Sequence, residues 1–265
     1  MTVETIASRD NPRLKRLRRL VADGAAYRRD GRVWIEGDHL CGAMLARGRQ
    51  PETVVCTQAG LAWVGAQQAA GRLDRQVAVW EVTDALMAWI SPLESPPAVA
   101  FLAPLGAPAA VTAGLPTVVL DRLQDPGNVG SILRSAAAFG FRQVLALRGT
   151  VALWAPKVLR AGMGAHFALQ LVEGAQASAL AGLGVPLLAT SSHQGEFLHA
   201  ARLPWPCAWL LGHEGQGVSP DLMAQAGLVV RIAQPGGEES LNVAAAAAIC
   251  LHASAVAAMG CASRR

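Results

Sequence analysis

The hydrophobic positions of the chain fall into short continuous runs that alternate with stretches of helical spacing. In the first hundred residues such runs predict strands at Arg32–Glu36, Thr53–Thr57, Val77–Val82 and Ala98–Ala103. Between them, the spacing predicts helices at Asp38–Arg47, Leu61–Ala70 and Asp84–Trp89. From Asn11 onward, an earlier helix is predicted with one apolar face, made by Leu14, Leu17, Leu20 and Val21. This alternation predicts a small α/β domain over residues 1–105.

A segment of small residues with Pro108 and Gly114, residues 106–115, predicts a linker to a second domain over residues 116–265. Strand runs resume there, at Thr117–Leu120, Gln143–Leu147, Phe167–Val172, Pro186–Ala189, Cys207–Leu211 and Leu228–Ile232. They are continuous rather than alternating, as in parallel strands covered on both faces. The predicted fold class is therefore α/β, with a parallel sheet in the second domain.

The Ala-rich stretch Asn242–Met259 predicts a closing helix. Within it, Val243–Gly260 is the nearest approach to a membrane-spanning segment. Most of its side chains are alanine, and His252 and Ser254 lie in its middle. We therefore expect a buried helix and no membrane association.

Composition narrows the classes of protein that fit. Hydrophobic residues make up 52% of the 265 residues and charged residues 16%, which excludes a disordered chain. The N-terminal residues carry charge where a signal peptide needs an apolar segment, so we do not expect secretion. The five cysteines are odd in number and never spaced C-x-x-C, which argues against a disulfide framework or a zinc site. We expect a cytoplasmic protein without a metal.

The net charge of +4 is concentrated at the start of the chain. Residues 1–50 contain 11 Lys and Arg against six Asp and Glu. Part of this excess lies around the first predicted helix, as Arg9, Arg13, Lys15, Arg16 and Arg19. Such a cluster is typical of phosphate contacts and makes these residues candidates for RNA binding. An ordinary solvated helix face explains the cluster equally well.

Polar and glycine residues of the second domain gather in three loops that each follow a predicted strand, where ligands bind in parallel α/β sheets. The first loop, after Leu120, contains the turn Asp125-Pro126-Gly127, and Asn128 is expected to cap the following helix. Arg134, one and a half turns into that helix, is expected to point back towards the loop.

The second loop, Leu211–Gly217, contains three glycines, which let a backbone approach a ligand closely. The third, Ile232–Asn242, leads into the closing helix, which Ser240 or Asn242 would cap. Neither G-x-G-x-x-G nor a phosphate-binding G-x-x-x-x-G-K-[ST] occurs in the sequence. A dinucleotide-dependent oxidoreductase is therefore unsupported.

The three loops together resemble a known family. N-V-G-S-I-L-R from Asn128, G-H-E-G-Q-G from Gly212 and E-S-L-N-V-A up to Ala244 look like the three motifs of SpoU/TrmH-type RNA 2′-O-ribose methyltransferases of the SPOUT superfamily. The opening Ser8–Pro12 resembles the start of members that carry an N-terminal L30e-like substrate-binding domain. The resemblance implies a C-terminal trefoil knot, S-adenosyl-L-methionine as cofactor, an RNA substrate and a homodimer.

The resemblance also implies roles for single residues. The family's catalytic polar positions are matched by Asn128, Arg134, Glu214, Ser240 and Asn242. Its cofactor-contacting positions are matched by Gly212, Ile232 and Leu241. The counterpart of Arg134 often acts near the cofactor pocket of the partner chain. Since a guanidinium is effectively always protonated, we expect Arg134 to fix a phosphate and stabilise charge on the 2′-oxygen, with Glu214 orienting it.

Two positions depart from the family pattern. Ala233-Gln234 stands where many relatives have Pro-Met, and Gly162 stands where they usually have serine. The first departure concerns the adenine side of the cofactor loop and the second a substrate contact.

Two functions remain open from the residues. The first is methylation of a ribose 2′-hydroxyl in structured RNA, with rRNA favoured over tRNA. The second is a non-catalytic RNA-binding protein that keeps the fold, which the basic N-terminal helix supports equally well. Because all five polar motif positions are filled, the sequence favours the enzyme.

Overall fold

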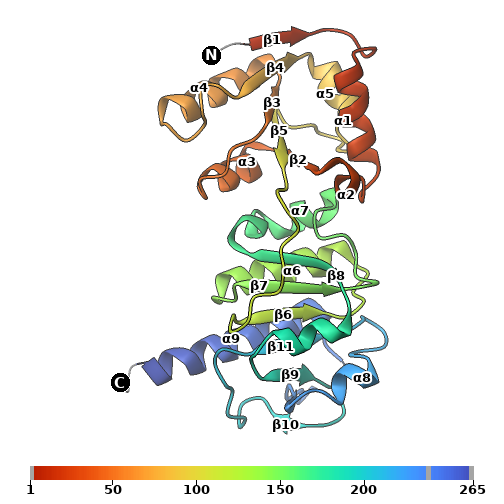
Figure 1. The fold of residues 1–265 in the computed structure, drawn as a ribbon, viewed down its shortest axis with the longest axis vertical. Coiled ribbons are helices and arrows are strands. Elements are labelled where there is room, and N and C mark those ends of the chain that lie inside the picture. Colours follow the sequence, from red (N-terminus) through yellow and green to blue (C-terminus); the bar gives the residue numbers. More distant parts are fainter. Residues whose placement is uncertain (1–2, 237–239, 263–265) are drawn as a thin grey trace. The chain divides into compact units, whose positions relative to one another are not determined.

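The computed structural model describes residues 3–236 and 240–262, which fall into two units (Figure 1). Unit 1 contains the residues up to Ala107 together with Trp154–Phe167. Unit 2 contains Pro108–Leu153 and the residues from Ala168 onward. The predicted boundaries differ from this division at Trp154–Phe167, which the sequence placed in the second domain. This segment carries the helix α7, which contacts strand β2 of unit 1 and buries Val158 and Leu159.

Unit 1 is built on a mixed five-stranded sheet with the order β1-β4-β3-β5-β2. Its strands are β1 (Val3–Ile6), β2 (Arg32–Glu36), β3 (Thr53–Cys56), β4 (Ala78–Val82) and β5 (Val99–Pro104). Its helices are α1 (Pro12–Ala22), α2 (Tyr27–Asp30), α3 (Asp38–Leu45), α4 (Leu61–Ala69), α5 (Asp84–Ile90) and α7 (Pro156–Gly162), with a 3₁₀ turn at Gln58–Gly60. The four predicted strands and four predicted helices are confirmed. The edge strand β1 was missed because its polar residues give no continuous apolar run.

Helix α1 begins where its sequence favours a helix start. Asn11 caps it by accepting a hydrogen bond from the Arg13 amide at 2.9 Å, and Pro12 occupies the first turn, where a missing amide hydrogen costs nothing. The predicted apolar face is buried, with Leu14 at 0% and Leu17 at 2% exposure. The basic side chains are thereby left on the opposite, solvent-facing side.

Unit 2 is built on a seven-stranded sheet in which every pairing is parallel, with the order β10-β12-β9-β11-β6-β7-β8. The strands are β6 (Thr117–Leu120), β7 (Gln143–Leu147), β8 (Gln170–Ala175), β9 (Leu187–Thr190), β10 (Glu196–Phe197), β11 (Ala208–Leu211) and β12 (Leu228–Arg231). The helices are α6 (Pro126–Ala138), α8 (Pro220–Met223) and α9 (Val243–Ala262), with a 3₁₀ turn at Ala177–Gly182. A further 3₁₀ turn, Ala165–Ala168, lies at the boundary, because unit 1 ends at Phe167 and unit 2 resumes at Ala168. The parallel α/β fold is confirmed, and the trefoil knot stays a prediction.

One predicted strand was misplaced and one was missed. The sequence predicted a strand over Phe167–Val172, but the Phe167 amide bonds back to the Gly164 carbonyl and forms a turn. The ladder with β7 begins only where the Gln170 amide bonds to the Arg142 carbonyl, so β8 starts at Gln170. The two-residue strand β10 at the sheet edge is too short to give a sequence pattern.

Helix α9 buries one face and exposes the other. It packs against α6 and β11, and Ser254 at its centre accepts a hydrogen bond from the indole of the fully buried Trp209 at 2.9 Å. On its other side, Ile249, Val256 and Met259 are 41%, 50% and 68% exposed. By length and composition alone this helix could cross a membrane, yet 28% of Val243–Gly260 is buried inside the protein, and core helices pass the same test. The predicted buried helix is therefore right for one face only.

Candidate functional site

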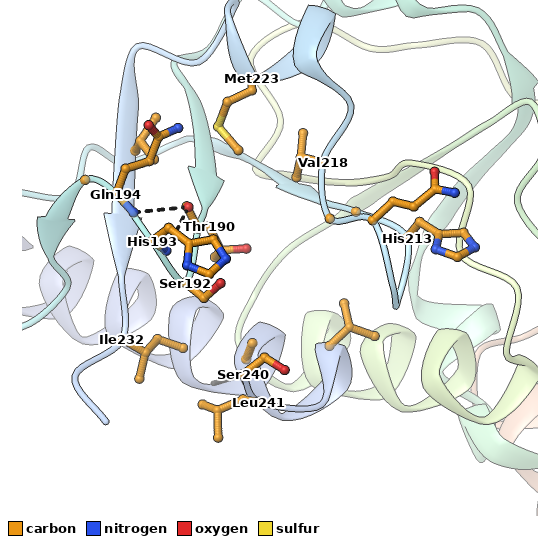
Figure 2. Close-up of a pocket in the computed structure, with 18 of the residues that line it drawn as sticks. Thr190, Ser192, His193, Gln194, His213, Val218, Met223, Ile232, Ser240 and Leu241 are labelled. Atoms are coloured by element: carbon orange, nitrogen blue, oxygen red, sulfur yellow. Dashed lines mark hydrogen bonds between the residues drawn. The ribbon is translucent and has the colours of Figure 1, made fainter. Parts of the chain in front are cut away.

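The carboxyl ends of four neighbouring parallel strands meet at one edge of the unit 2 sheet. Strands β12, β9, β11 and β6 lie side by side, so the loops that follow them gather there. Three of these loops, after β9, β11 and β12, line a cavity of about 1050 Å³. Figure 2 shows it between Thr190, His193 and Gln194 on one side and His213 and Val218 on the other.

The loop Gly212–Val218 after β11 passes very close to itself. A side chain at Gly212 would place its first carbon 2.0 Å from the Gly217 carbonyl carbon and 2.0 Å from the Val218 nitrogen. The Gly217 amide closes the turn by donating to the His213 carbonyl at 2.8 Å. Only glycine fits at position 212, so the cavity wall is bare backbone at this point.

The Glu214 carboxylate ties this loop to the loop after β6. It accepts hydrogen bonds from the backbone amides of Gln124 at 3.2 Å and Asp125 at 3.1 Å, and from the Asn128 side-chain amide at 3.3 Å. Burial acts to raise the pKa of Glu214, but these hydrogen bonds together outweigh it and hold the pKa below its usual value. Glu214 is therefore a charged acceptor at neutral pH.

Asn128 extends the connection to the third loop. Its side-chain oxygen accepts a hydrogen bond from the Asn242 side chain at 2.9 Å. The Asn242 oxygen in turn caps α9 by accepting from the Ala244 amide at 2.9 Å, so of the two predicted caps, Ser240 and Asn242, it is Asn242 that serves. Glu214, Asn128 and Asn242, up to 114 positions apart, thus form one hydrogen-bonded chain.

The prediction that Asn128 caps α6 is wrong. Asp125 caps the helix by accepting from the Asn128 amide at 2.7 Å, and Pro126 occupies the first helical position. The helix therefore begins earlier than expected. Because Asp125 performs the capping, the Asn128 side chain is available to bridge Glu214 and Asn242.

The structure does not bring Arg134 to this site within one chain. Arg134 is exposed on α6 and is not among the residues that line the cavity. Within residues 3–236 and 240–262, no hydrogen bond or ion pair joins it to Glu214. The expectation that Glu214 orients Arg134 is thus wrong for the single chain, because backbone amides and Asn128 already occupy the carboxylate.

The remaining predicted positions line the cavity. Gly212, Ile232, Ser240 and Leu241 all do so, and Figure 2 shows Ile232, Ser240 and Leu241 in the lower part of the view. Glu239 and the start of the third motif lie outside the described residues. The departure Ala233-Gln234 matters here: Gln234 lines the cavity, and its buried side-chain oxygen has no hydrogen-bond partner in the described chain.

Sequence reasoning missed the fourth loop, Ser191–Gly195 after β9. Ser191, Ser192, His193 and Gln194 line the cavity, and the Ser191 hydroxyl accepts from the amides of His193 and Gln194 at 3.2 and 3.3 Å. The available signal was the run of polar residues directly after a predicted strand. Gly195, with φ +102°, lets this loop turn against β12, since a side chain there would lie 2.4 Å from the Val229 carbonyl oxygen.

The predicted RNA-binding cluster lies on α1, with Arg9 just before it, and is partly neutralised. Arg13 pairs with Glu4 at 2.7 Å, Lys15 with Asp10 at 2.7 Å and Arg16 with Asp30 at 3.5 Å. Over the described residues, no ion pair engages Arg9 or Arg19, and the Arg19 guanidinium donates only to the Lys15 carbonyl, at 3.4 Å.

Arginines of α1 also contact aromatic rings of unit 1. Arg13 lies over the Trp80 ring at 5.2 Å, and Arg18 lies over the Trp89 ring at 4.4 Å. The face therefore combines cations and aromatic rings, as nucleic-acid-binding surfaces do.

Comparison with known proteins covers both units. The sequence profile of the SpoU rRNA methylase family matches residues 116–252, and that of the MRM3-like substrate-binding domain matches residues 11–100. The chain is 30% identical to a tRNA/rRNA methyltransferase of Synechocystis, itself uncharacterized, over 94% of this chain and 93% of that protein. It is also 56% identical over 63 residues to the mitochondrial rRNA methyltransferase 3 of mouse, but these cover 23% of this chain and only 15% of that protein.

Solved structures share the whole fold. An AdoMet-bound rRNA methyltransferase from Sinorhizobium meliloti superposes with a TM-score of 0.80 and 27% identity, over 95% of this chain and 97% of that one. A structure described as an RNA 2′-O ribose methyltransferase superposes with a TM-score of 0.78 and 29% identity, over 97% of this chain and 100% of that one. With the profile match over more than half of its length, and with Gly212, Glu214 and Ser240 from two of the motif loops lining one cavity, the chain belongs to the SpoU rRNA methylase family.

Proposed function

We propose that this protein transfers a methyl group from S-adenosyl-L-methionine to a ribose 2′-hydroxyl of structured RNA, with ribosomal RNA as the substrate class. The observation that carries this proposal is the hydrogen-bonded chain Glu214–Asn128–Asn242, which joins the three motif loops at the edge of the cavity. The names of the relatives support it: one solved relative carries AdoMet, and another is named for the 2′-O ribose reaction.

The cavity suits the proposed cofactor. Its volume of about 1050 Å³ is just above the usual range for ligand sites, and the wall at Gly212 offers backbone at close range. Buried polar atoms are normally hydrogen-bonded, so the unpaired oxygen of Gln234 fits a ligand with an amino group, such as adenine. Gly212, Ile232 and Leu241 would hold the cofactor, which when bound supplies an electrophilic methyl group.

The protein's own residues would orient and stabilise the reacting ribose. Glu214, Asn128 and Asn242 hold three loops in register, so the walls of the cavity are fixed before any ligand arrives. Arg134 carries a permanent positive charge and would anchor the phosphate beside the target ribose. There it would stabilise negative charge that develops on the 2′-oxygen as its proton leaves.

We propose that the active form is a homodimer in which Arg134 serves the cavity of the partner subunit. Arg134 does not reach the cavity of its own chain, although α6, on which it lies, packs against α9. The exposed residues Ile249, Val256 and Met259 repeat at intervals of seven and three along α9, which places them on one face. An apolar helix face of this kind is typical of a subunit interface.

The oligomeric state tests this part directly. In analytical ultracentrifugation we expect a dimer for the wild type and a monomer for the I249E/V256E variant. A separate His252→Glu variant changes the edge of the helix that contacts Phe139, and we expect it to weaken the dimer less. A monomeric wild type would remove the partner subunit from the site.

We also propose that the protein works in the reducing cytoplasm. Cys41, Cys56, Cys207 and Cys250 are free and buried. Burial raises the pKa of the Cys56 and Cys207 thiols to about 11, so they stay protonated and unreactive at neutral pH. Fractionation of cells with an antibody against the protein would check this location.

The reaction itself is tested with purified protein, methyl-labelled cofactor and ribosomal RNA. Methylation of a 2′-oxygen blocks alkaline cleavage of the adjacent linkage, so we expect label in alkali-resistant dinucleotides. Label on a base would contradict the proposal. Absence of any cofactor binding in calorimetry would favour a non-catalytic RNA-binding protein instead, and transfer RNA assayed in parallel would show which RNA class is preferred.

A further inference from the structure

Arg122, directly after β6, has a backbone conformation that side chains rarely adopt. Its φ is +60°, and across residues 3–236 and 240–262 the only other non-glycine residue with a positive φ is Met163. In this left-handed region the side chain crowds the following carbonyl, whereas glycine adopts it freely. An arginine at this position therefore needs compensating contacts.

The contacts of Arg122 hold it from both sides. Its guanidinium binds the Asp121 carboxylate through two hydrogen bonds, Nε to Oδ1 at 3.0 Å and Nη2 to Oδ2 at 3.3 Å. Its remaining terminal nitrogen donates to the Gln216 side-chain oxygen at 3.0 Å. The Arg122 amide donates to the Thr150 hydroxyl at 3.1 Å, and its carbonyl accepts from the Gln124 side chain at 3.1 Å.

These contacts reach the loop that forms one wall of the cavity. Gln216 belongs to the cavity-lining loop Gly212–Val218, and Asp121 also accepts from the Ser219 amide at 2.8 Å, just beyond that loop. The Asp121–Arg122 pair thus fixes the loop at residues 216 and 219, while Glu214 fixes it at a third point.

The pair remains charged near neutral pH. Burial of Asp121 acts to raise its pKa, but the hydrogen bonds from Arg122 and Ser219 outweigh burial and lower it. A carboxylate in a forked contact with a guanidinium is a rigid anchor, and lysine could not reproduce that geometry.

We propose that Arg122 is a positioning residue that holds the Gly212–Val218 loop in the shape required to bind the cofactor. The strained backbone is tolerated because, in this conformation, one side chain reaches both Asp121 and Gln216. This inference rests on the proposed function for the identity of the ligand, but the hold on the loop is independent of it.

The first measurement is amide hydrogen exchange without any ligand. In the Arg122→Gly variant, we expect the amides of Gly217 and Ser219 to exchange about tenfold faster, because the loop loses a charge-assisted hydrogen bond. The amides of β7 should keep their wild-type rates. Arg148→Gly, which alters an exposed arginine with no side-chain bond among the described residues, is the matched control. Unchanged exchange in Arg122→Gly would overturn the proposal.

The second measurement is calorimetry with S-adenosylhomocysteine as the probe, in a double-mutant cycle of Arg122→Gly and Gln216→Ala. If Arg122 acts through Gln216, each variant binds several-fold more weakly, and the double variant is no weaker than Arg122→Gly alone. Independent, multiplying effects would overturn the proposal, as would faster exchange with unchanged affinity.

Failure of the Arg122→Gly variant to fold and failure of the wild type to bind the probe are each handled separately. Because Arg122→Gly leaves the Asp121 carboxylate without its cation, the D121N/R122G variant repeats both measurements should the single variant fail to fold. If it shows wild-type exchange and affinity, the proposal falls. A wild-type protein that binds no S-adenosylhomocysteine contradicts the proposed function, while the exchange rates still decide whether Arg122 holds the loop.

Discussion

Polar residues are organised in opposite ways in the two units. In unit 1 the predicted RNA-binding residues lie within α1 and just before it, and their partners are carboxylates near in sequence, as in the pair Lys15–Asp10. In unit 2 the contact between Glu214 and Asn128 joins residues 86 positions apart, and that between Asn128 and Asn242 joins residues 114 apart. A local cluster forms wherever its helix forms, whereas a convergent cluster requires the whole sheet to be in place. The first arrangement suits adaptable binding of RNA phosphates and the second suits chemistry that needs fixed distances.

The largest expected effect concerns Arg134, which belongs neither to the local cluster of unit 1 nor to the convergent cluster of unit 2. Arg134 lies in unit 2 but, among the residues that the structure describes, has no hydrogen bond or ion pair with Glu214, Asn128 or Asn242. Arg134→Ala should therefore leave folding and cofactor affinity nearly unchanged. If it stabilises charge in the transition state, turnover should fall by about 10²–10³-fold. Single-turnover methylation assays measure this, with the exposed Arg142→Ala as the control. Unchanged turnover would remove Arg134 from the mechanism.

The second prediction breaks the convergent cluster at its centre. All three partners of Glu214 donate hydrogen bonds, so Glu214→Gln would point an amide NH₂ group at a donor. We expect cofactor affinity and turnover to fall by about tenfold, since the loop would lose charge-assisted hydrogen bonds and one donor would face another. Calorimetry and turnover assays test this prediction. A Gln variant with wild-type affinity would show that the loops hold their positions without the charge.

The third prediction sharpens the comparison from the side of unit 1. Neutralising Arg13, Lys15, Arg16 and Arg19 together should weaken RNA binding and reduce its salt dependence. Since the first three already pair with carboxylates, Arg9→Gln with Arg19→Gln should reduce the salt slope more than Arg13→Gln with Lys15→Gln. Filter binding measures the salt slope of each variant between about 50 and 200 mM salt, the range over which phosphate contacts weaken. Equal slopes would mean that the ion pairs break on binding.

The smallest effect is the pH dependence of the Glu214 contacts. The pKa of Glu214 is lower in the folded protein than in the unfolded chain, where it is about 4.3. The contribution of Glu214 to the free energy of unfolding is therefore complete above the pKa of the unfolded chain, and it is lost as the pH falls through the pKa of the folded protein. From about pH 8 to 5 we expect Glu214 to contribute no pH dependence to the unfolding temperature. The difference between wild type and Glu214→Gln should narrow only below that range. A difference that narrows already near pH 6 would contradict the direction of the shift.

Much of the fold was predictable because its signals are local. The strands Arg32–Glu36, Thr117–Leu120 and Gln143–Leu147 have the predicted ends, since continuous apolar runs between turn residues specify buried strands. Edge strands such as β10 escaped because they bury little. The expected strand at Phe167 failed because a backbone turn, which depends on Gly164, overrides the apolar pattern.

The candidate site was predictable in its membership but less so in its contacts. The motif resemblance identified Glu214, Asn128 and Asn242, and the structure joins them. It could not show that Asp125 rather than Asn128 caps α6, that Glu214 bonds to backbone rather than to Arg134, or that Ser191–Gly195 forms part of the cavity wall. The last two depend on which loops the sheet order places side by side, whereas the cap is a local contact between residues three positions apart.

The sequence by itself determined the alternation of strands and helices, the buried face of α1 and the three loops that carry the motif residues, because hydrophobic spacing and turn chemistry act over a few neighbouring positions. The tertiary structure alone decided which of these residues touch. The order β12-β9-β11-β6 brings loops from distant parts of the chain to one edge, and the left-handed backbone at Arg122 is held there by Asp121 and Gln216, 94 positions beyond Arg122. Hydrogen bonds require partners within about 3 Å, and only the assembled sheet sets distances on that scale.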